Sequence, residues 1–225
     1  MEAIILAGGR GSRLGANKNK SDILANKKTL LQHHCEQLKP YAEKVYIVEG
    51  FFSVNRSHIT LPFEILSNTN GVISAIRHAL RQAEDDCILV FGDEYADDPN
   101  YSKMIREFYK RDSIVTLGYI TRNQNTELIH DTYSIELSRN QVLRIVEKPI
   151  ILPNCLQGTA YSVISKDFEK YLTENILAYP SSVQLAIDNG EVVTAIDFAD
   201  EFFNINTPRE LARMRDFFQK IAQSA

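Results

Sequence analysis

The stretch that decides the fold is Ala3-Ile4-Ile5-Leu6-Ala7-Gly8-Gly9-Arg10-Gly11-Ser12-Arg13-Leu14-Gly15. A run of five apolar residues that ends at glycine is typical of a buried parallel strand. Four glycines in the next eight positions let the backbone turn sharply and bring its N–H groups close to an anion. Arg10 and Arg13 add fixed positive charge to the same loop. The junction of strand and loop therefore predicts a phosphate-binding site.

The spacing of these glycines excludes two common phosphate-binding loops. Dinucleotide-binding domains use Gly-x-Gly-x-x-Gly and P-loop NTPases use Gly-x-x-x-x-Gly-Lys-Ser/Thr, and neither pattern occurs between Gly8 and Gly15. The loop is therefore expected to bind a phosphorylated ligand in another way.

Composition and charge describe an ordinary globular chain. Its 225 residues are 44% apolar and 24% charged, with a net charge of −4, which argues against a disordered protein and against one that coats nucleic acid. Three cysteines without Cys-x-x-Cys spacing predict neither a disulfide framework nor a structural zinc site. No apolar run approaches the roughly 18 residues of a membrane-spanning helix, and the first residues do not resemble a secretory signal. We expect a cytoplasmic protein that binds neither membrane nor nucleic acid.

Strand and helix patterns alternate along the first half of the chain. The strand candidates are short apolar runs, and the helix candidates carry apolar residues at helical spacing. This alternation predicts right-handed parallel crossovers and a doubly wound α/β sheet flanked by helices. The expected strands are 3–7, 45–48, 63–66, 87–91 and 114–120, and the expected helices are 28–38, 72–83 and 100–110.

The pattern changes after residue 120. Residues 132–137 and 142–146 flank a polar turn, which predicts a small antiparallel insertion beside a mixed, mostly parallel sheet. Thr207 and Pro208 predict the N-cap and first residue of a last helix. Its apolar stripe comprises Leu211, Met214, Phe217, Phe218 and Ile221. Further strands are expected at 158–164 and 192–196, and helices at 167–177, 181–188 and 208–221.

Residues Leu6 to Leu14 resemble the signature of the nucleotidyltransferases that activate sugar phosphates, Leu-Ala-Gly-Gly-x-Gly-x-Arg-Leu, and match every fixed position. The second half of that signature, Pro-Lys-x-Leu-Leu-Pro-Val-x-Gly-Lys-Pro/Thr-Leu-Leu, aligns without a gap on Asn19 to Leu31. The resemblance implies a Rossmann-like nucleotidyltransferase fold in which Lys20 is the catalytic lysine, assisted by Arg10 and Arg13.

Three of the departures from this signature change the character of the residue most. Asn19 replaces proline, Asp22 replaces leucine and Lys27 replaces glycine. The alignment therefore depends on spacing and on the closing Lys28-Thr29-Leu30-Leu31. The resemblance implies a single domain over residues 1–225, with a nucleotide-binding half (1–120), an acceptor-binding half (121–206) and a C-terminal helix (207–225).

The resemblance assigns nucleotide binding to the glycine-rich loop and to two later segments. The segment Ser67–Ala75 lies where the family reads the nucleobase, and side-chain amides there can both donate to and accept from a base edge. Its Thr-Asn sequence is similar to that of cytidylyltransferases for alcohol phosphates, which favours CTP slightly. Asn70 is alternatively the N-cap of the following helix. The expected nucleotide-binding residues are Leu6, Ala7, Gly8, Gly9, Arg10, Gly11, Arg13, Asn70, Gly71 and Gly92.

Two residues are expected to bind Mg²⁺. Asp93 follows the strand 87–91 at the carboxyl edge of the sheet, where open α/β sheets bind ligands, and the resemblance gives this aspartate to the metal. Asn204, in Asn-x-Asn-Thr-Pro, aligns with a second metal-binding aspartate, and an amide oxygen can also bind a hard cation. Alternatively, Asp93 only caps a turn or a helix, and Asn204 and Asn206 only organise the start of the last helix.

Two further motifs resemble the acceptor site of the family. Glu147-Lys148-Pro149 matches the segment that binds the sugar phosphate, so that Lys148 would contact the phosphate and Glu147 the sugar hydroxyls. Gly158 and Tyr161 match the Gly-x-Tyr strand that lines the sugar pocket. A buried glycine and tyrosine within a strand are the structural alternative.

These motifs together predict a Mg²⁺-dependent nucleotidyltransferase of NDP-sugar biosynthesis, which transfers NMP from an NTP to a sugar 1-phosphate and releases pyrophosphate. Such a reaction brings two anions together, so positioning and charge neutralisation matter more than a protein nucleophile. One alternative is a cytidylyltransferase or guanylyltransferase for an alcohol phosphate, a phosphonate or a cofactor. Another is a regulator that binds nucleotide without turnover. The resemblance also allows a homodimer, and the five histidines form no zinc motif.

Overall fold

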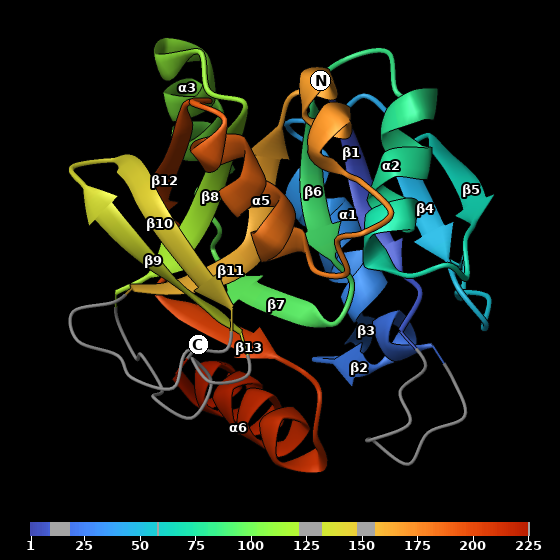
Figure 1. Ribbon diagram of the computed structural model, residues 1–225. Coiled ribbons are helices and arrows are strands. Elements are labelled where there is room, and N and C mark those ends of the chain that lie inside the picture. Colours follow the sequence, from blue (N-terminus) through green and yellow to red (C-terminus); the bar gives the residue numbers. More distant parts are fainter. Residues whose placement is uncertain (10–18, 58, 122–131, 148–155, 225) are drawn as a thin grey trace.

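Nine strands form a twisted mixed sheet in the computed structural model, which describes residues 1–9, 19–57, 59–121, 132–147 and 156–224 (Figure 1). The strand order is β5-β4-β1-β6-β11-β8-β12-β10-β9, and two short pairs, β2–β3 and β7–β13, lie apart from it. The elements are β1 (Glu2–Ala7), the 3-10 helix η2 (Lys20–Asp22), β2 (Leu24–Ala25), β3 (Lys28–Thr29), α1 (Leu30–Leu38), β4 (Val45–Glu49), β5 (Phe63–Ser67), α2 (Val72–Gln82), β6 (Cys87–Phe91), β7 (Glu94–Asp97), α3 (Tyr101–Arg111), β8 (Val115–Ile120), β9 (Tyr133–Ser138), β10 (Gln141–Glu147), β11 (Leu156–Ile164), the 3-10 helix η3 (Lys166–Tyr171), α5 (Tyr179–Asp188), β12 (Val193–Asp197), β13 (Glu201–Asn204) and α6 (Pro208–Ser224).

The sheet combines a parallel part with an antiparallel part. β1 pairs in parallel with β4 and β6, β4 with β5, and β8 with β12, whereas β11 runs antiparallel between β6 and β8. The predicted α/β fold with a mixed sheet is confirmed. The predicted hairpin is also confirmed as β9–β10, but it continues the main sheet because β10 pairs antiparallel with β12.

Helices cover both faces of the sheet, which explains why its central strands are apolar throughout. In β1, Ala3 and Ile5 pack in the cluster that contains α1 and α3, while Ile4 packs in the cluster that contains α2 and α5. All three side chains are fully buried. The alternation follows from the two-residue period of a strand. The parallel pairing of β1, β4, β5 and β6 places their carboxyl ends at one edge.

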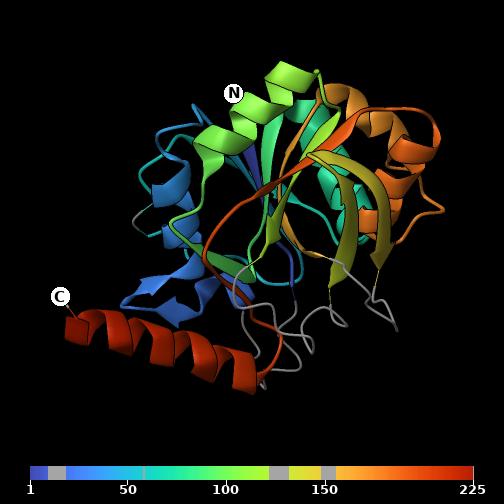
Figure 2. The same cartoon turned by 90° about the vertical axis from the view of Figure 1, so that its left-hand side faces the viewer.

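The last helix, α6, closes a third apolar cluster below the β2–β3 hairpin (Figure 2). Thr207 and Glu210 form a reciprocal cap at its start: the Glu210 N–H donates to Thr207 Oγ1 at 3.3 Å and the Thr207 N–H donates to Glu210 Oε2 at 2.8 Å. Met214 and Phe218 are buried in the cluster, but Ile221 is 42% exposed, so the predicted apolar stripe ends one turn early.

The helix expected at 167–177 is wrong in length. Only the six-residue 3-10 helix η3 forms, and Phe168 and Tyr171 are already buried within it. Leu172 then leaves the helical region of the backbone, with φ −89° and ψ 68°. Because the apolar spacing is satisfied by this short turn, the sequence overestimates the helix, and Leu177 is exposed.

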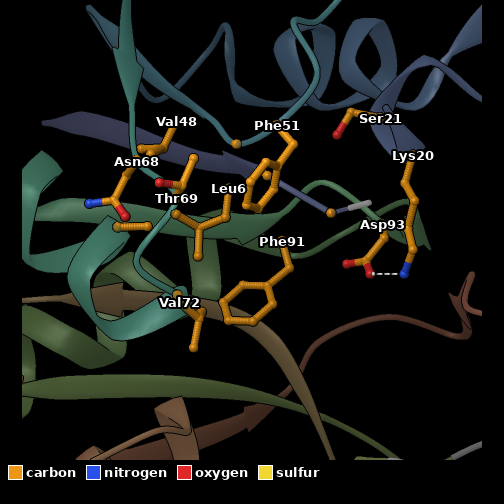
Figure 3. Close-up of a pocket in the computed structure, with 15 residues that line it drawn as sticks. Leu6, Lys20, Ser21, Val48, Phe51, Asn68, Thr69, Val72, Phe91 and Asp93 are labelled. Atoms are coloured by element: carbon orange, nitrogen blue, oxygen red, sulfur yellow. Dashed lines mark hydrogen bonds and ion pairs between the residues drawn. The ribbon is translucent and has the colours of Figure 1, made fainter. Parts of the chain in front are cut away.

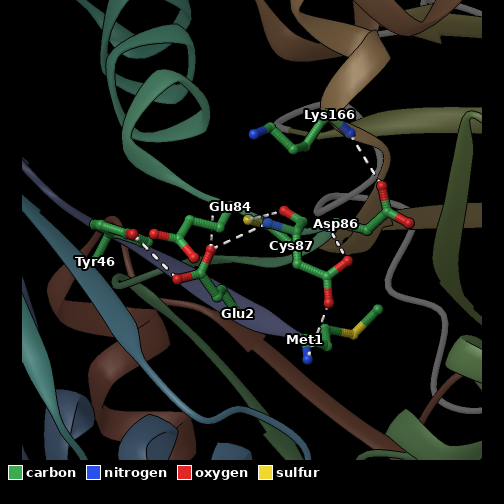
Figure 4. A network of polar contacts seen from close by, with 8 residues as sticks. Met1, Glu2, Tyr46, Glu84, Asp86, Cys87 and Lys166 are labelled. Carbon is green, nitrogen blue, oxygen red and sulfur yellow. Dashed lines mark hydrogen bonds and ion pairs between the residues drawn. The ribbon is translucent and has the colours of Figure 1, made fainter.

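The amino ends of the central strands are joined by polar contacts (Figure 4). The Glu2 carboxylate accepts hydrogen bonds from the Tyr46 hydroxyl at 3.1 Å and from the Glu84 N–H at 2.6 Å. Asp86 accepts from the Lys166 N–H at 3.1 Å. These contacts close one edge of the sheet, so a ligand site is expected at the opposite, carboxyl edge.

Cys35 and Cys87 are buried and free of disulfide bonds, as expected, and Cys155 lies outside the described residues. No helix in the described part of the chain is long and apolar enough to span a membrane.

Candidate functional site

A cavity of about 320 Å³ opens at the carboxyl ends of β1, β4, β5 and β6 (Figure 3). One wall is apolar and the other carries the charged pair of Lys20 and Asp93. The apolar wall comprises Leu6, Val48, Phe51, Val72, Ala75 and Phe91, and the remaining lining comprises Gly8, Gly9, Lys20, Ser21, Gly50, Asn68, Thr69, Gly71 and Asp93. A cavity with an apolar wall and a few convergent polar groups is the usual form of a small-molecule site.

Lys20 is the centre of the polar contacts at this cavity. Its Nζ lies 2.9 Å from Asp93 Oδ2 and donates at 2.5 Å to Asn206 Oδ1. The Asn206 amide in turn donates to Asn204 Oδ1. Lys20 and Asp93 are both mostly shielded from solvent, with 13% and 25% of their side chains exposed. The structure therefore brings the predicted lysine and the predicted metal-binding aspartate into direct contact.

The short β7–β13 pair explains how residues so distant in sequence meet. Asn204 pairs with Glu94 in its register, and the Ile205 N–H donates to the Asp93 carbonyl at 2.8 Å. The chain segment after β13 thus lies directly beside the segment after β6. The sequence did not predict β7, so this route between the two motifs was missed.

The donors at this point suit a hard cation. The Asp93 carboxylate and the Asn206 amide oxygen both bind the Lys20 ammonium, and carboxylate and amide oxygens are also the ligands that Mg²⁺ prefers. Asn206, which the sequence reasoning left unassigned, reaches Lys20, whereas Asn204 is 8% exposed and contacts Asn206. The sequence Asn204-Ile205-Asn206 already indicated that a second side-chain amide lies close to that of Asn204. Among the described residues, no group of three or more His, Cys, Asp or Glu residues is arranged so that it could hold a metal ion.

Glycines let the loops approach one another closely. A Cβ on Gly92 would lie 2.2 Å from Ser21 Oγ, and a Cβ on Gly50 would lie 2.5 Å from the Gly8 carbonyl oxygen. Gly92, expected to bind nucleotide, is therefore placed to let the turn that carries Lys20 pack against the end of β6. It does not line the cavity, and neither does Ala7.

The loop expected to read the nucleobase contributes Asn68, Thr69 and Gly71 to the cavity. Asn68 Oδ1 accepts from the Asn70 N–H at 2.8 Å, and Asn68 Nδ2 donates to Ser74 Oγ at 3.0 Å. Asn70 itself lies outside this lining. The alternative role of Asn70 as the N-cap of α2 is wrong, because Gly71 is the N-cap residue, with φ 95°.

Phe51 is a cavity residue that sequence reasoning missed. It follows β4, lines the cavity and is 54% exposed, which is unusual for a large apolar side chain. Figure 3 shows its ring on the same side of the cavity as Leu6. The available signal was an aromatic pair, Phe51 and Phe52, directly after a buried strand.

Three of the predicted acceptor residues, Glu147, Gly158 and Tyr161, do not line this cavity. Glu147 is the exposed last residue of β10 and lines a separate hollow of about 350 Å³. A Cβ on Gly158 would lie 2.0 Å from the Tyr133 ring, so Gly158 makes room for that ring. Tyr161 is fully buried, and its ring packs 4.9 Å from that of Phe198. For Gly158 and Tyr161 the geometry favours the structural alternative.

Two buried titratable groups lie behind the site. The Glu94 carboxylate accepts from the Ala160 N–H at 2.9 Å, and burial, followed by the nearby Asp93 charge, raises its pKa well above the ordinary value. Burial lowers the pKa of His34 to about 3. Neither ring nitrogen of His34 has a hydrogen-bond partner among the described residues. His34 is thus a neutral residue of the core.

Four predicted site residues lie outside the described residues. They are Arg10, Gly11, Arg13 and Lys148.

The fold and the cavity define an α/β domain in which Gly8 and Gly9, an apolar wall and a lysine–aspartate pair meet at the carboxyl edge of the sheet. Residues 3–140 match the family model of the MobA-like NTP transferase domain. The chain therefore belongs to the MobA-like NTP transferase family, a family of nucleotidyltransferases.

Curated relatives match part of the chain. The bifunctional protein GlmU of Methanococcus maripaludis is 26% identical over 157 residues, which is 66% of this chain and 36% of that protein. GlmU of Ruthia magnifica is 33% identical over 101 residues, which is 41% of this chain and 22% of that protein. The chain thus spans about a third or less of the length of these relatives.

Solved structures match the fold over almost the whole chain. A putative glucose-1-phosphate thymidylyltransferase from Bacillus anthracis has a TM-score of 0.85 at 17% identity, covering 97% of this chain and 95% of that one. The inositol-1-phosphate CTP transferase from T. maritima has a TM-score of 0.80 at 19% identity, covering 98% and 95%. A UDP-glucose pyrophosphorylase complexed with UDP-glucose has a TM-score of 0.82 at 15% identity, covering 98% and 99%. At these identities the likeness shows the fold.

Proposed function

We propose that this protein is a Mg²⁺-dependent nucleotidyltransferase that transfers NMP from an NTP to a sugar 1-phosphate, giving an NDP-sugar and pyrophosphate. The observation that carries the proposal is the Lys20 ammonium, held at 2.9 Å from Asp93 at the edge of a cavity walled by Gly8 and Gly9. A fixed cation beside glycine backbone N–H groups is suited to neutralise a phosphate as it is attacked.

The proposed reaction is an in-line attack by an acceptor phosphate oxygen on the α-phosphorus of the NTP. The new P–O bond joins acceptor and NMP, and the bond to the β-phosphate oxygen breaks, so that pyrophosphate leaves. Lys20 holds the α-phosphate, and the loop with Arg10 and Arg13 holds the triphosphate. The acceptor-binding roles of Glu147 and Lys148 remain predictions, since Glu147 lines a hollow separate from the Lys20 cavity.

The nucleobase is proposed to bind between the apolar wall and the loop of Asn68 and Thr69. Phe51, exposed at the edge of that wall, offers a flat face for stacking on a base. The side-chain amide of Asn68 is already fixed by Ser74, which gives the loop a defined shape before ligand binds.

Asp93 and the paired amides of Asn204 and Asn206 would hold Mg²⁺. The bound ion would neutralise phosphate charge and orient the triphosphate. The contacts that the Asp93 and Asn206 oxygens already make with the Lys20 ammonium support these two donors, and Asn204 is joined to them through Asn206. The expected cytoplasmic location and homodimer remain predictions.

A second candidate is a cytidylyltransferase or guanylyltransferase for an alcohol phosphate, a phosphonate or a cofactor. Thr69 and Asn68 line the cavity, and the Thr-Asn sequence of their loop is the feature that resembles cytidylyltransferases. One structural neighbour is an inositol-1-phosphate CTP transferase, an enzyme of this class.

The test is pyrophosphate release from CTP, UTP, dTTP, GTP and ATP with Mg²⁺, against sugar 1-phosphates and alcohol phosphates. We expect release with one base and one acceptor class, lost in Asp93→Ala and retained in the matched control Asp167→Ala, which changes an exposed aspartate. Release with an alcohol phosphate alone would select the second candidate. Tight nucleotide binding without release over the whole panel would select a non-catalytic regulator.

A further inference from the structure

Asn19 makes three hydrogen bonds to three separate segments around the cavity. Its Nδ2 donates to the Ala7 carbonyl at 2.5 Å and to the Phe52 carbonyl at 2.9 Å, and its Oδ1 accepts from the Ser21 N–H at 3.0 Å. The residue is 1% exposed. One buried amide therefore joins the end of β1, the loop after β4 and the η2 turn.

The Ser21 bond fixes the turn that carries Lys20. Asn19 is the N-cap of η2, and Lys20 is the first residue of that turn. The Lys20 stem then passes Gly9, where a Cβ would lie 3.3 Å from Lys20 Cδ, and its ammonium reaches Asp93. A lysine side chain samples many rotamers when it is free. Fixing the Lys20 backbone in the η2 turn therefore limits the positions that its ammonium group can reach.

The Phe52 bond ties the adjacent aromatic wall to the same turn. Phe51 lines the cavity and is covalently next to the carbonyl that Asn19 holds. The backbone of Gly50 also meets that of Gly8 here, and a Cβ on Gly50 would lie 2.5 Å from the Gly8 carbonyl oxygen. The Lys20 turn and the Phe51 loop thus share one buried polar anchor.

We propose that Asn19 is a positioning residue that fixes Lys20 against Asp93 and ties the Phe51 loop to the same turn. The predicted effect of Asn19 on turnover rests on the proposed function. The predicted effect of Asn19 on the position of the Lys20 ammonium does not depend on that function. Asn19 has φ −61° and ψ 133°, which a proline also adopts. Asn19 therefore achieves with hydrogen bonds what a proline ring would achieve by restricting the backbone.

The first test is the reactivity of Lys20 toward limiting acetic anhydride, read by peptide mass spectrometry relative to the exposed Lys110. In Asn19→Ala the relative labelling of Lys20 rises at least about threefold, because the turn is released and the ammonium leaves Asp93 more often. The matched control is Asn100→Ala, which removes a side-chain bond to the Lys103 N–H at the start of α3. It leaves Lys20 labelling unchanged. Unchanged labelling in a folded Asn19→Ala protein would overturn the proposal.

A second pair of variants keeps the test informative. Asn19→Pro restores Lys20 labelling to the wild-type level, and labelling as high as in Asn19→Ala would overturn the assigned turn-fixing role. If Asn19→Ala fails to fold, Asn19→Asp replaces it: it is isosteric and sets a carboxylate oxygen against the Ala7 and Phe52 carbonyls. Labelling of Lys20 in Asn19→Asp rises as well, and wild-type labelling in this folded variant would contradict the proposal.

Kinetics separate this proposal from the proposed function. With an active substrate pair, Asn19→Ala lowers kcat about tenfold, since a small displacement of a catalytic group costs rate, and Asn19→Pro recovers most of it. A folded Asn19→Ala with wild-type kcat would overturn the positioning role. Altered labelling in a protein whose wild type releases no pyrophosphate would support Asn19 as the anchor of Lys20 and reject only the proposed function.

Discussion

The edge of the sheet at Lys20 and Asp93 differs from the interior of β11, although both carry sequence motifs of the same family. At the edge, three motifs far apart in sequence meet in one set of polar contacts: Lys20, Asp93 and Asn206. Inside β11, Gly158 and Tyr161 pack against Tyr133 and Phe198. Motifs at the carboxyl ends of parallel strands thus predict chemistry, whereas a motif inside a strand with two buried faces first has to satisfy packing.

The largest effect is expected at the edge. Lys20→Ala should lower kcat by about two to three orders of magnitude, because it removes a fixed charge aimed at the reacting phosphate. Its unfolding midpoint should change far less than turnover, because Asp93 is 25% exposed and water can solvate its carboxylate once Lys20 is removed. Steady-state pyrophosphate release and a thermal melt measure both. Near-normal turnover would mean that the edge is not the reacting centre; Lys110→Ala is the matched control.

A smaller effect is expected at the apolar wall. Phe51→Ala should raise the Kd for the NTP about tenfold with little change in kcat, because base stacking on an aromatic ring contributes about 1–3 kcal/mol. Isothermal titration with the preferred NTP measures this change. Phe63→Ala, at another exposed phenylalanine away from the cavity, is the control. Equal affinity in wild type and Phe51→Ala would remove this residue from the nucleobase site.

The interior should respond to pH rather than to substrate. Unfolded His34 takes up a proton below its ordinary pKa of 6.5, whereas the folded protein keeps it neutral down to about 3. Stability from this group is therefore present above pH 6.5 and is lost as pH falls, by about 2 kcal/mol between pH 7 and pH 5. Glu94 acts in the opposite direction, since its raised pKa makes ionisation in the folded state costly as pH rises.

His34→Leu should remove that acid-side loss. Urea unfolding of wild type and variant at pH 7 and pH 5 isolates the contribution of His34, because the other groups are common to both proteins. A wild type and a variant that lose equal stability between the two pH values would show that His34 is not a buried neutral group.

The smallest effect is expected at β11. Tyr161→Phe should leave kcat/KM within about twofold of wild type, because the hydroxyl has no hydrogen-bond partner among the described residues and the side chain is fully buried. The same steady-state assay measures it. A large rise in the KM for the acceptor, with kcat unchanged, would show that Tyr161 contributes to the acceptor site. The interior of β11 would then not differ from the Lys20–Asp93 edge in the way proposed.

Much of the fold was predictable because apolar runs and helical spacing are local properties. The strands β1, β4, β5, β6 and β8 and the helices α2, α3 and α6 form within two residues of their expected bounds at most ends. Lys20 and Asp93 of the edge site were also predictable, because each lies in a short loop motif that resembles the nucleotidyltransferase signature.

What the sequence did not predict depends on contacts between distant segments. β7 and β13 are short and form only by pairing with each other, yet they bring Asn206 to Lys20. The β2–β3 turn places Asn26 and Lys27 at positive φ, 50° and 67°, at the point where the resembling signature has glycine. Pairing, rather than local preference, holds both features in place.

The most direct test of the central claim is ³¹P NMR of reaction mixtures that contain the preferred NTP, its acceptor phosphate and Mg²⁺, with wild type and with Lys20→Ala. With wild type we predict that pyrophosphate and a new acceptor–NMP diphosphate linkage appear together. With Lys20→Ala both should appear at least about a hundredfold more slowly. Release of inorganic phosphate in place of pyrophosphate would contradict the proposed transfer of NMP, and equal rates in the two proteins would contradict the proposed role of Lys20.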